Sequence, residues 1–128
     1  MAADERNDTF YQTDERILLF GPLWLNRDKY RVMTAFHTEA IFSEDEFKTL
    51  YLLAANNELP LSFEHLYHRV WDKGDGRDRR DEALNGINSV MEQVNAVEPT
   101  MLWIAYQADK GYSFRLNEAY HDSAGGKR

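Results

Sequence analysis

The sequence contains no cysteine, and this absence excludes several kinds of site. Without thiols there is no disulfide framework, no thiolate metal centre and no cysteine nucleophile. No apolar run approaches the roughly 20 residues that a membrane-spanning helix needs. The first residues also lack the basic start and apolar centre of a signal peptide. These absences predict a cytoplasmic protein with no membrane contact.

Positive charge is also scarce. The chain has 15 Lys and Arg residues against 22 Asp and Glu residues, which gives a formal net charge of −7. Acidic residues outnumber basic ones within residues 17–116 as well. Nucleic-acid-binding domains usually carry the opposite charge, because their contacts to phosphates need Lys and Arg. The charge therefore argues against an ordinary DNA-binding surface.

The remaining composition is that of a globular protein. With 128 residues, 43% of them hydrophobic and 13% aromatic, the chain has the size and apolar content of one independently folding domain. Residues 1–16 are polar and are predicted to form a flexible leader. Residues 117–128, which include Gly125 and Gly126, are predicted to form a flexible tail. The domain is expected to span residues 17–116.

The first half of this domain is predicted to contain a sheet and one helix. Residues 17–25, 30–36 and 39–42 are rich in aliphatic and aromatic residues and predict short antiparallel strands. Ser43 and Glu46 form a capping box, in which each side chain satisfies the backbone N–H group of the other residue, so a helix should begin there. Its apolar stripe follows the helical period: Phe47, Leu50, Tyr51 and Ala54.

The second half is predicted to contain two helices and a hairpin. A helix beginning at Ser62 has the stripe Phe63, Leu66, Tyr67, Val70 and Trp71. After a charged loop over residues 72–81, a third helix has the stripe Leu84, Ile87, Val90, Met91 and Val94. Residues 101–106 and 112–116 read as two strands joined at Gly111, where a positive φ is expected. The fold class is therefore α+β, with three helices between an N-terminal antiparallel sheet and a C-terminal β-hairpin.

Four stretches together resemble the C-terminal effector domain of OmpR/PhoB-type response regulators. They are Tyr30–Met33, Phe42–Leu50 with its Ser-x-x-Glu-Phe start, Leu61–Trp71 with its Val-Trp end, and the closing Gly111–Phe114. The similarity extends over residues 17–116. It implies a winged helix-turn-helix that acts in transcription regulation within a two-component system. It also implies that the third helix lies in the major groove of double-stranded DNA and that the hairpin, or wing, reaches the minor groove.

The chain departs from this family at the positions that contact DNA. The family's third helix carries several Arg or Lys residues, whereas the only formal charge between Ala83 and Val97 here is Glu92. In the hairpin, Tyr106 and Asp109 stand where the family has Thr and part of an Arg-Gly pair. These departures leave two functions open.

The first candidate function is divergent binding to double-stranded DNA, as a homodimer or together with a basic partner domain. The remaining cations could contact phosphates, and amide side chains can in principle read adenine edges. The candidate DNA-binding residues are Arg77, Arg79, Arg80, Asn85, Asn88, Ser89, Gln93 and Lys110.

The second candidate function is the binding of a regulatory protein by a winged helix that no longer binds DNA. Tyrosine is enriched at the energetic centres of protein interfaces, and an uncharged helix face suits such a contact. The candidate protein-interaction residues are Met91, Glu92, Tyr106 and Asp109.

Catalysis, metals and cofactors are not expected. The sequence has no glycine-rich phosphate loop and no Ser-His-Asp ordering, so the chain is not predicted to be an enzyme. His65 and His68 lie three residues apart, but no third ligand has a defined spacing, so they are interpreted as polar surface residues.

Overall fold

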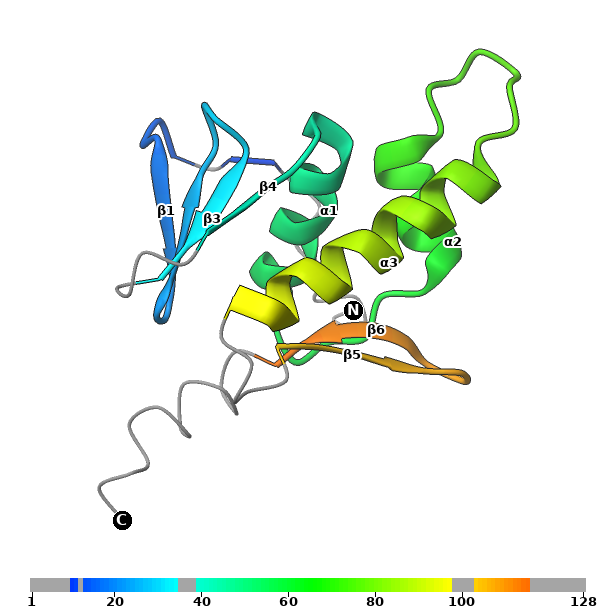
Figure 1. Ribbon diagram of the computed structural model, residues 1–128. Helices are drawn as coiled ribbons and strands as arrows, with labels where there is room; N and C mark the ends of the chain where they lie inside the picture. Colours follow the sequence, from blue (N-terminus) through cyan, green and yellow to red (C-terminus); the bar gives the residue numbers. More distant parts are fainter. Residues whose placement is uncertain (1–9, 12, 35–38, 98–102, 116–128) are drawn as a thin grey trace.

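The structure, a computed structural model, describes residues 10–11, 13–34, 39–97 and 103–115 (Figure 1). A four-stranded antiparallel sheet comes first along the chain, helical segments follow, and a two-stranded hairpin comes last. In Figure 1 the helices occupy the centre, with the sheet to one side of them and the hairpin below. The predicted order of sheet, three helices and hairpin is confirmed.

The N-terminal sheet pairs its strands in chain order: β1 (Ile17–Phe20), β2 (Leu23–Asn26), β3 (Arg31–Met33) and β4 (Glu39–Ile41). The prediction of one strand over residues 17–25 is wrong, because the chain turns at Gly21, where φ is 62°. Glycine adopts this left-handed conformation without steric cost. The predicted strand over residues 30–36 ends at Met33, and residues 35–36 lie outside the described residues. One cross-strand row faces the core: Leu18, Leu25, Val32 and Ala40.

Helix α1 (Glu44–Ala55) begins at the predicted capping box. Ser43 Oγ accepts a hydrogen bond from Glu46 N at 3.2 Å, and Glu46 Oε1 accepts one from Ser43 N at 3.0 Å. These bonds satisfy backbone groups that the first turn leaves unpaired. The predicted stripe is buried in the core, namely Phe47, Leu50, Tyr51 and Ala54.

The predicted second helix consists of two parts. Helix α2 (Phe63–Leu66) begins at Ser62, and the chain continues directly as one π-helical turn, η1 (Tyr67–Trp71). Trp71 ends this turn and is buried, as predicted, with its Nε1 donating a hydrogen bond to Thr49 Oγ1 at 3.0 Å. The bond ties the end of the second helix to α1.

Helix α3 (Arg80–Val97) begins inside the segment that was predicted to be a loop. The prediction that the loop extends through Asp81 is therefore wrong. Asp81 and Glu82 lie in the first turn, where carboxylates interact favourably with the positive end of the helix dipole. Of the predicted stripe, Ile87, Val90 and Val94 are buried and Met91 is half-buried, but the prediction for Leu84 is wrong, since it is exposed. The buried side of α3 is completed by Ala83, Gly86 and Val97.

Strands β5 (Ile104–Gln107) and β6 (Gly111–Phe114) form the predicted hairpin. Residues 101–102 and 116 of the two predicted strands lie outside the described residues. Gly111 has a φ of 113°, and a Cβ there would collide with the backbone of Leu61, so the position requires glycine. Leu61 N donates to Tyr112 O at 2.7 Å, which joins the chain before α2 to the hairpin.

Two aromatic residues before the sheet pack on the core. The Tyr11 ring lies 5.1 Å from the Tyr51 ring, and the Phe10 ring lies 6.3 Å from it. These contacts are N-terminal to the domain boundary at residue 17, which stays a prediction. Among the described helices, none combines the length and the apolar content needed to span a bilayer.

Candidate binding surface on helix α3 and the hairpin

The outward side of α3 carries acids and amides. Because α3 buries one side in the core, the helical period turns another set of residues to solvent. Asn85 and Asn88, two candidate DNA-binding residues, are exposed there, as is Glu92. Asp81 and Glu82 are exposed at the start of the helix, and no Lys or Arg follows Arg80 within α3. Beyond Arg80, this surface therefore presents no side-chain cation along α3.

The side chains of Ser89 and Gln93 are hydrogen-bonded to each other. Gln93 Nε2 donates a hydrogen bond to Ser89 Oγ at 2.8 Å, and both side chains are half-buried. Met91 is also half-buried and packs against the core. Of these three candidate residues, none is fully exposed on the outward side of α3.

Arg79 is held by a carboxylate in the loop before α3. Its Nη1 and Nη2 donate to Asp75 Oδ1 and Oδ2 at 2.9 Å and 2.8 Å, a bidentate arrangement that leaves its side chain 12% exposed. Hydrogen bonds from the Arg79 side chain and from the Arg77 backbone hold the pKa of Asp75 well below its usual range. Arg79 is therefore not available to a phosphate while this pair is intact.

Arg80 is also paired with an acid, but through one hydrogen bond and with its side chain 47% exposed. Its Nη2 donates to Glu64 Oε1 at 2.9 Å, and its guanidinium lies over the Tyr67 ring at 4.6 Å from the centroid. The hydrogen bond from Arg80 lowers the pKa of Glu64. Two of the three arginines predicted to contact DNA are thus neutralised by neighbouring acids.

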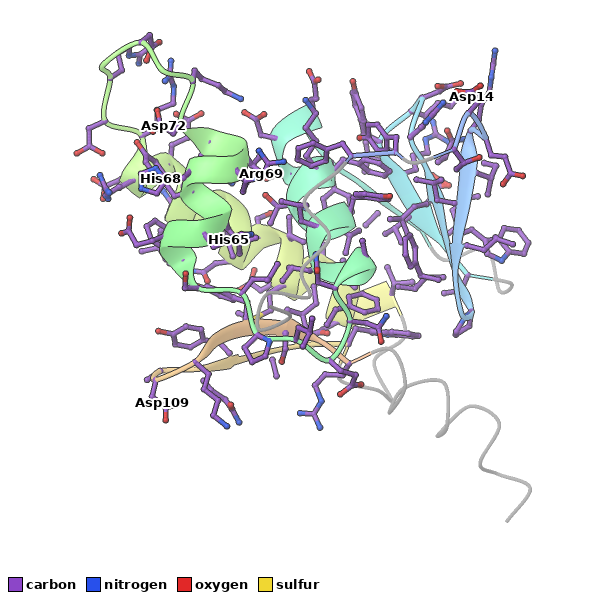
Figure 2. All side chains as sticks on the ribbon, turned by 180° about the vertical axis from the view of Figure 1, so that it is seen from behind. Asp14, His65, His68, Arg69, Asp72 and Asp109 are labelled. Atoms are coloured by element: carbon purple, nitrogen blue, oxygen red, sulfur yellow. The ribbon has the colours of Figure 1, made fainter. Side chains whose placement is uncertain are left out.

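Two candidate cations remain exposed. Arg77 lies in the loop and Lys110 in the hairpin turn, and neither side chain forms an ion pair with a described residue. In Figure 1 the loop extends beyond the N-terminal end of α3, whereas the hairpin runs beneath the helix. Asp109 lies at the tip of the hairpin beside Lys110 (Figure 2).

Tyr106 is the large exposed aromatic of the hairpin. Its side chain is 53% exposed, and its ring lies 4.7 Å from the Tyr112 ring, which is buried. The two rings are tilted by 43°, and the contact leaves part of the Tyr106 ring open to solvent. Such a residue offers contact area to a partner at a small entropic cost.

His68 of the second helix lies between two carboxylates. His68 Nε2 lies 3.3 Å from Glu64 Oε1, and His68 Nδ1 lies 3.2 Å from Asp72 Oδ2. Figure 2 shows His68 next to Asp72 at the end of the helix, with His65 nearer its start. Each ring nitrogen faces a different carboxylate, and the described residues contain no group of three or more ligands that could hold a metal ion.

A groove lies between the start of α1 and α3, and sequence reasoning did not identify it. It has a volume of about 540 Å³ and is lined by Ser43, Glu46, Trp71, Glu82, Asn85, Gly86 and Ser89. Gly86 lets the Trp71 ring pack closely on α3, because the ring occupies the space that a side chain at position 86 would take. The nearest sequence signal is the glycine inside the predicted helix, which often marks close packing.

The same fold occurs in several solved structures. The DNA-binding domain of E. coli CadC is 13% identical over 81% of this chain and 95% of that domain, with a TM-score of 0.66. The C-terminal domain of NsrR, a lantibiotic response regulator, is 20% identical over 77% of this chain and 96% of that domain, with a TM-score of 0.63. The DNA-binding domain of Klebsiella pneumoniae RstA, solved in complex with the RstA box, is 21% identical over 79% and 98%, with a TM-score of 0.58.

No protein-family model and no curated protein matches the sequence. At the identities of the solved structures, the likeness concerns the fold alone. It agrees with the described order of sheet, three helices and hairpin. The chain therefore has the winged-helix fold of the C-terminal DNA-binding domains of OmpR/PhoB-type response regulators.

Proposed function

We propose that this chain is a winged-helix module of the transcription-regulator type in which α3 binds a protein in place of DNA. The observation that carries this proposal is the charge on the helix and before it. Arg79 and Arg80 are paired with Asp75 and Glu64, and the exposed charges that follow on α3 are acidic. A surface of this kind gives phosphates little to bind, whereas exposed amides and an aromatic residue suit a protein interface.

A divergent mode of DNA binding is the second candidate. Its support is the similarity in fold to DNA-binding domains, including the RstA domain in complex with the RstA box. Arg77 and Lys110 are exposed and could contact phosphates, with Asn85 and Asn88 on α3 between them. Two copies bound side by side would double these few contacts.

A titration of random-sequence duplex DNA separates the two candidates. Fluorescence anisotropy of labelled DNA is measured against protein concentration at low and at moderate salt. Protein binding by α3 predicts no saturable binding at either salt concentration. Binding that weakens steeply as salt rises would show that phosphates are contacted, because each contact releases counterions. That result would overturn the proposed function and favour the divergent DNA-binding mode.

A further inference from the structure

The groove between α1 and α3, which we call the α1–α3 groove, is open to solvent and rich in hydrogen-bond acceptors. Its rim includes the carboxylates of Glu46 and Glu82, the amide of Asn85 and the hydroxyl of Ser89. The Glu46 carboxylate accepts the Ser43 backbone N–H group through Oε1, which leaves acceptor capacity on Oε2. These groups come from two helices that share one opening.

The charge around the α1–α3 groove is negative. Glu46 and Glu82 on its rim, and Asp81 and Glu92 on the same exposed side of α3, form no ion pair with a described Lys or Arg. The cations nearest along the chain have other partners, as Lys73 pairs with Asp45, Arg79 with Asp75 and Arg80 with Glu64. The unpartnered side of α3 is therefore complementary to a positively charged surface.

The acceptors of the α1–α3 groove favour an arginine over a lysine. The groove has a volume of about 540 Å³, and the Trp71 indole, which packs against Gly86, is among its lining residues. A guanidinium group presents five N–H donors in a plane and can bind acceptors on two walls at once, whereas an ammonium group acts as a point charge. The carboxylates of Glu46 and Glu82 supply acceptors on opposite helices.

We propose that the α1–α3 groove receives an arginine side chain from a basic segment of a protein partner. This proposal rests on the proposed function, since it names the chemistry of the partner that α3 would bind. The net charge of −7 adds a long-range attraction that guides such a segment towards the domain.

The test uses the full chain and two synthetic helical peptides that differ only at one set of positions. The first peptide carries arginine at every fourth position, and the second carries citrulline, which has the same shape without the charge. Amide NMR shifts are followed during each titration. We expect the arginine peptide to shift Ser43, Glu82, Asn85, Gly86 and Ser89, and the citrulline peptide to shift none of them.

Charge variants distinguish the groove from general attraction. Glu82→Gln with Glu92→Gln removes two acids of α3 and should weaken binding of the arginine peptide by about tenfold. Asp14→Asn with Glu15→Gln removes the same charge from exposed positions at the sheet end of the molecule, where Figure 2 shows Asp14, and should leave the affinity unchanged. Equal weakening in both double variants, or shifts spread over other acidic surfaces, would overturn the proposal. Saturable binding of free arginine at the same residues would also overturn it, in favour of a small-molecule site.

Failure here is distinguishable from failure of the proposed function. If the arginine peptide does not bind and duplex DNA does not bind either, the partner segment is not basic, while binding of a protein by α3 still stands. If duplex DNA binds with a steep dependence on salt and shifts the α3 amides, the proposed function itself fails.

Discussion

At the scale of single residues, Gly86 shows how one missing side chain shapes the molecule. A Cβ at this position would collide with the Cη2 and Cζ2 atoms of the Trp71 ring. Trp71 cannot move away easily, because it is 3% exposed and its Nε1 is hydrogen-bonded to Thr49. Close contact between α3 and the second helix therefore depends on glycine here.

We expect Gly86→Ala to destabilise the domain by about 1–2 kcal/mol. Overpacking of a core destabilises a protein by about 1–3 kcal/mol. The higher helix propensity of alanine offsets only part of this loss. Urea unfolding followed by tryptophan fluorescence measures the change. Asn85→Ala, at an exposed position of the same helix, is the control and should be neutral or slightly stabilising. Equal stability of Gly86→Ala and the wild type would contradict the packing described for Trp71.

Tyr11 makes the stability of the domain sensitive to alkaline pH. Burial raises the pKa of Tyr11 to about 12, and the neighbouring Tyr30 and Glu44 add to this effect. The folded protein thus favours the neutral phenol. The contribution of Tyr11 to the free energy of unfolding is fully present below about pH 10, the pKa of tyrosine in the unfolded chain. It is lost as the pH rises from about 10 to about 12.

Tyr11→Phe should reduce this alkaline loss of stability, because phenylalanine keeps the ring but cannot ionise. The measurement is the thermal unfolding midpoint at several values between about pH 9 and pH 11.5. The variant should lose less of its midpoint over this range than the wild type. If Tyr11→Phe instead follows the wild-type curve, the burial of Tyr11 does not contribute to the alkaline loss of stability.

At the scale of elements, one asparagine joins α3 to the hairpin. Asn95 Oδ1 accepts hydrogen bonds from Trp103 N at 2.8 Å and Ile104 N at 3.0 Å, and Asn95 Nδ2 donates to Ile104 O at 3.1 Å. The side chain thereby acts in place of a strand partner at the start of β5. The position of the hairpin relative to α3 depends on this side chain.

Asn95→Ala should cost about 2–3 kcal/mol, because it leaves three backbone groups without their partner. Asn95→Asp keeps the acceptor and loses the donor, so it should cost less. Thermal unfolding gives the stability, and hydrogen exchange at Trp103 and Ile104 tests the location of the effect. Asn88→Ala serves as the control because Asn88 is exposed on α3. Unchanged exchange at both amides in Asn95→Ala would contradict the proposed link.

Sequence patterns predicted those elements whose signals are local. The capping box at Ser43 fixed the start of α1, and the positive φ at Gly111 followed from hairpin chemistry. Prediction failed where a turn or a helix start lies inside a longer run of similar residues. The apolar run over residues 17–25 was predicted to be one strand, although the chain turns at Gly21. The charged run over residues 72–81 was predicted to be a loop, although α3 begins at Arg80.

At the scale of the whole molecule, the sequence predicted the chemistry of the candidate surface better than its arrangement. The lack of cations on the third helix was visible directly. The pairing of Arg80 with Glu64 was not, because 16 residues separate them and only the packing of α3 on the second helix brings them together. The α1–α3 groove could not be predicted for the same reason, since its lining residues come from the start of α1, from Trp71 and from α3 around Gly86.

The paired arginines lead to a prediction for the whole molecule. If Arg79 and Arg80 are withheld from phosphates by their acidic partners, removal of those partners should create an affinity for DNA. The double variant Glu64→Gln with Asp75→Asn removes the partner of Arg79 and the closer partner of Arg80, whose Nη1 still lies 4.0 Å from Asp78 Oδ1, and it reduces the negative charge by two. We expect it to bind random-sequence duplex DNA at low salt, with a slope of log K against log salt steeper than that of the wild type by about 2.

The matched control for this gain is Asp14→Asn with Glu15→Gln, which changes the net charge equally at exposed positions away from α3. Net charge acts at long range and would favour DNA similarly in both double variants, whereas released arginines act only in the first. Anisotropy titrations of the wild type and both variants under the same conditions separate these effects. Equal affinity in the two double variants would mean that the overall charge of the domain, and not the pairing of Arg79 and Arg80, keeps it from DNA. A gain confined to Glu64→Gln with Asp75→Asn would identify the local ion pairs as the feature that directs this winged helix away from phosphates.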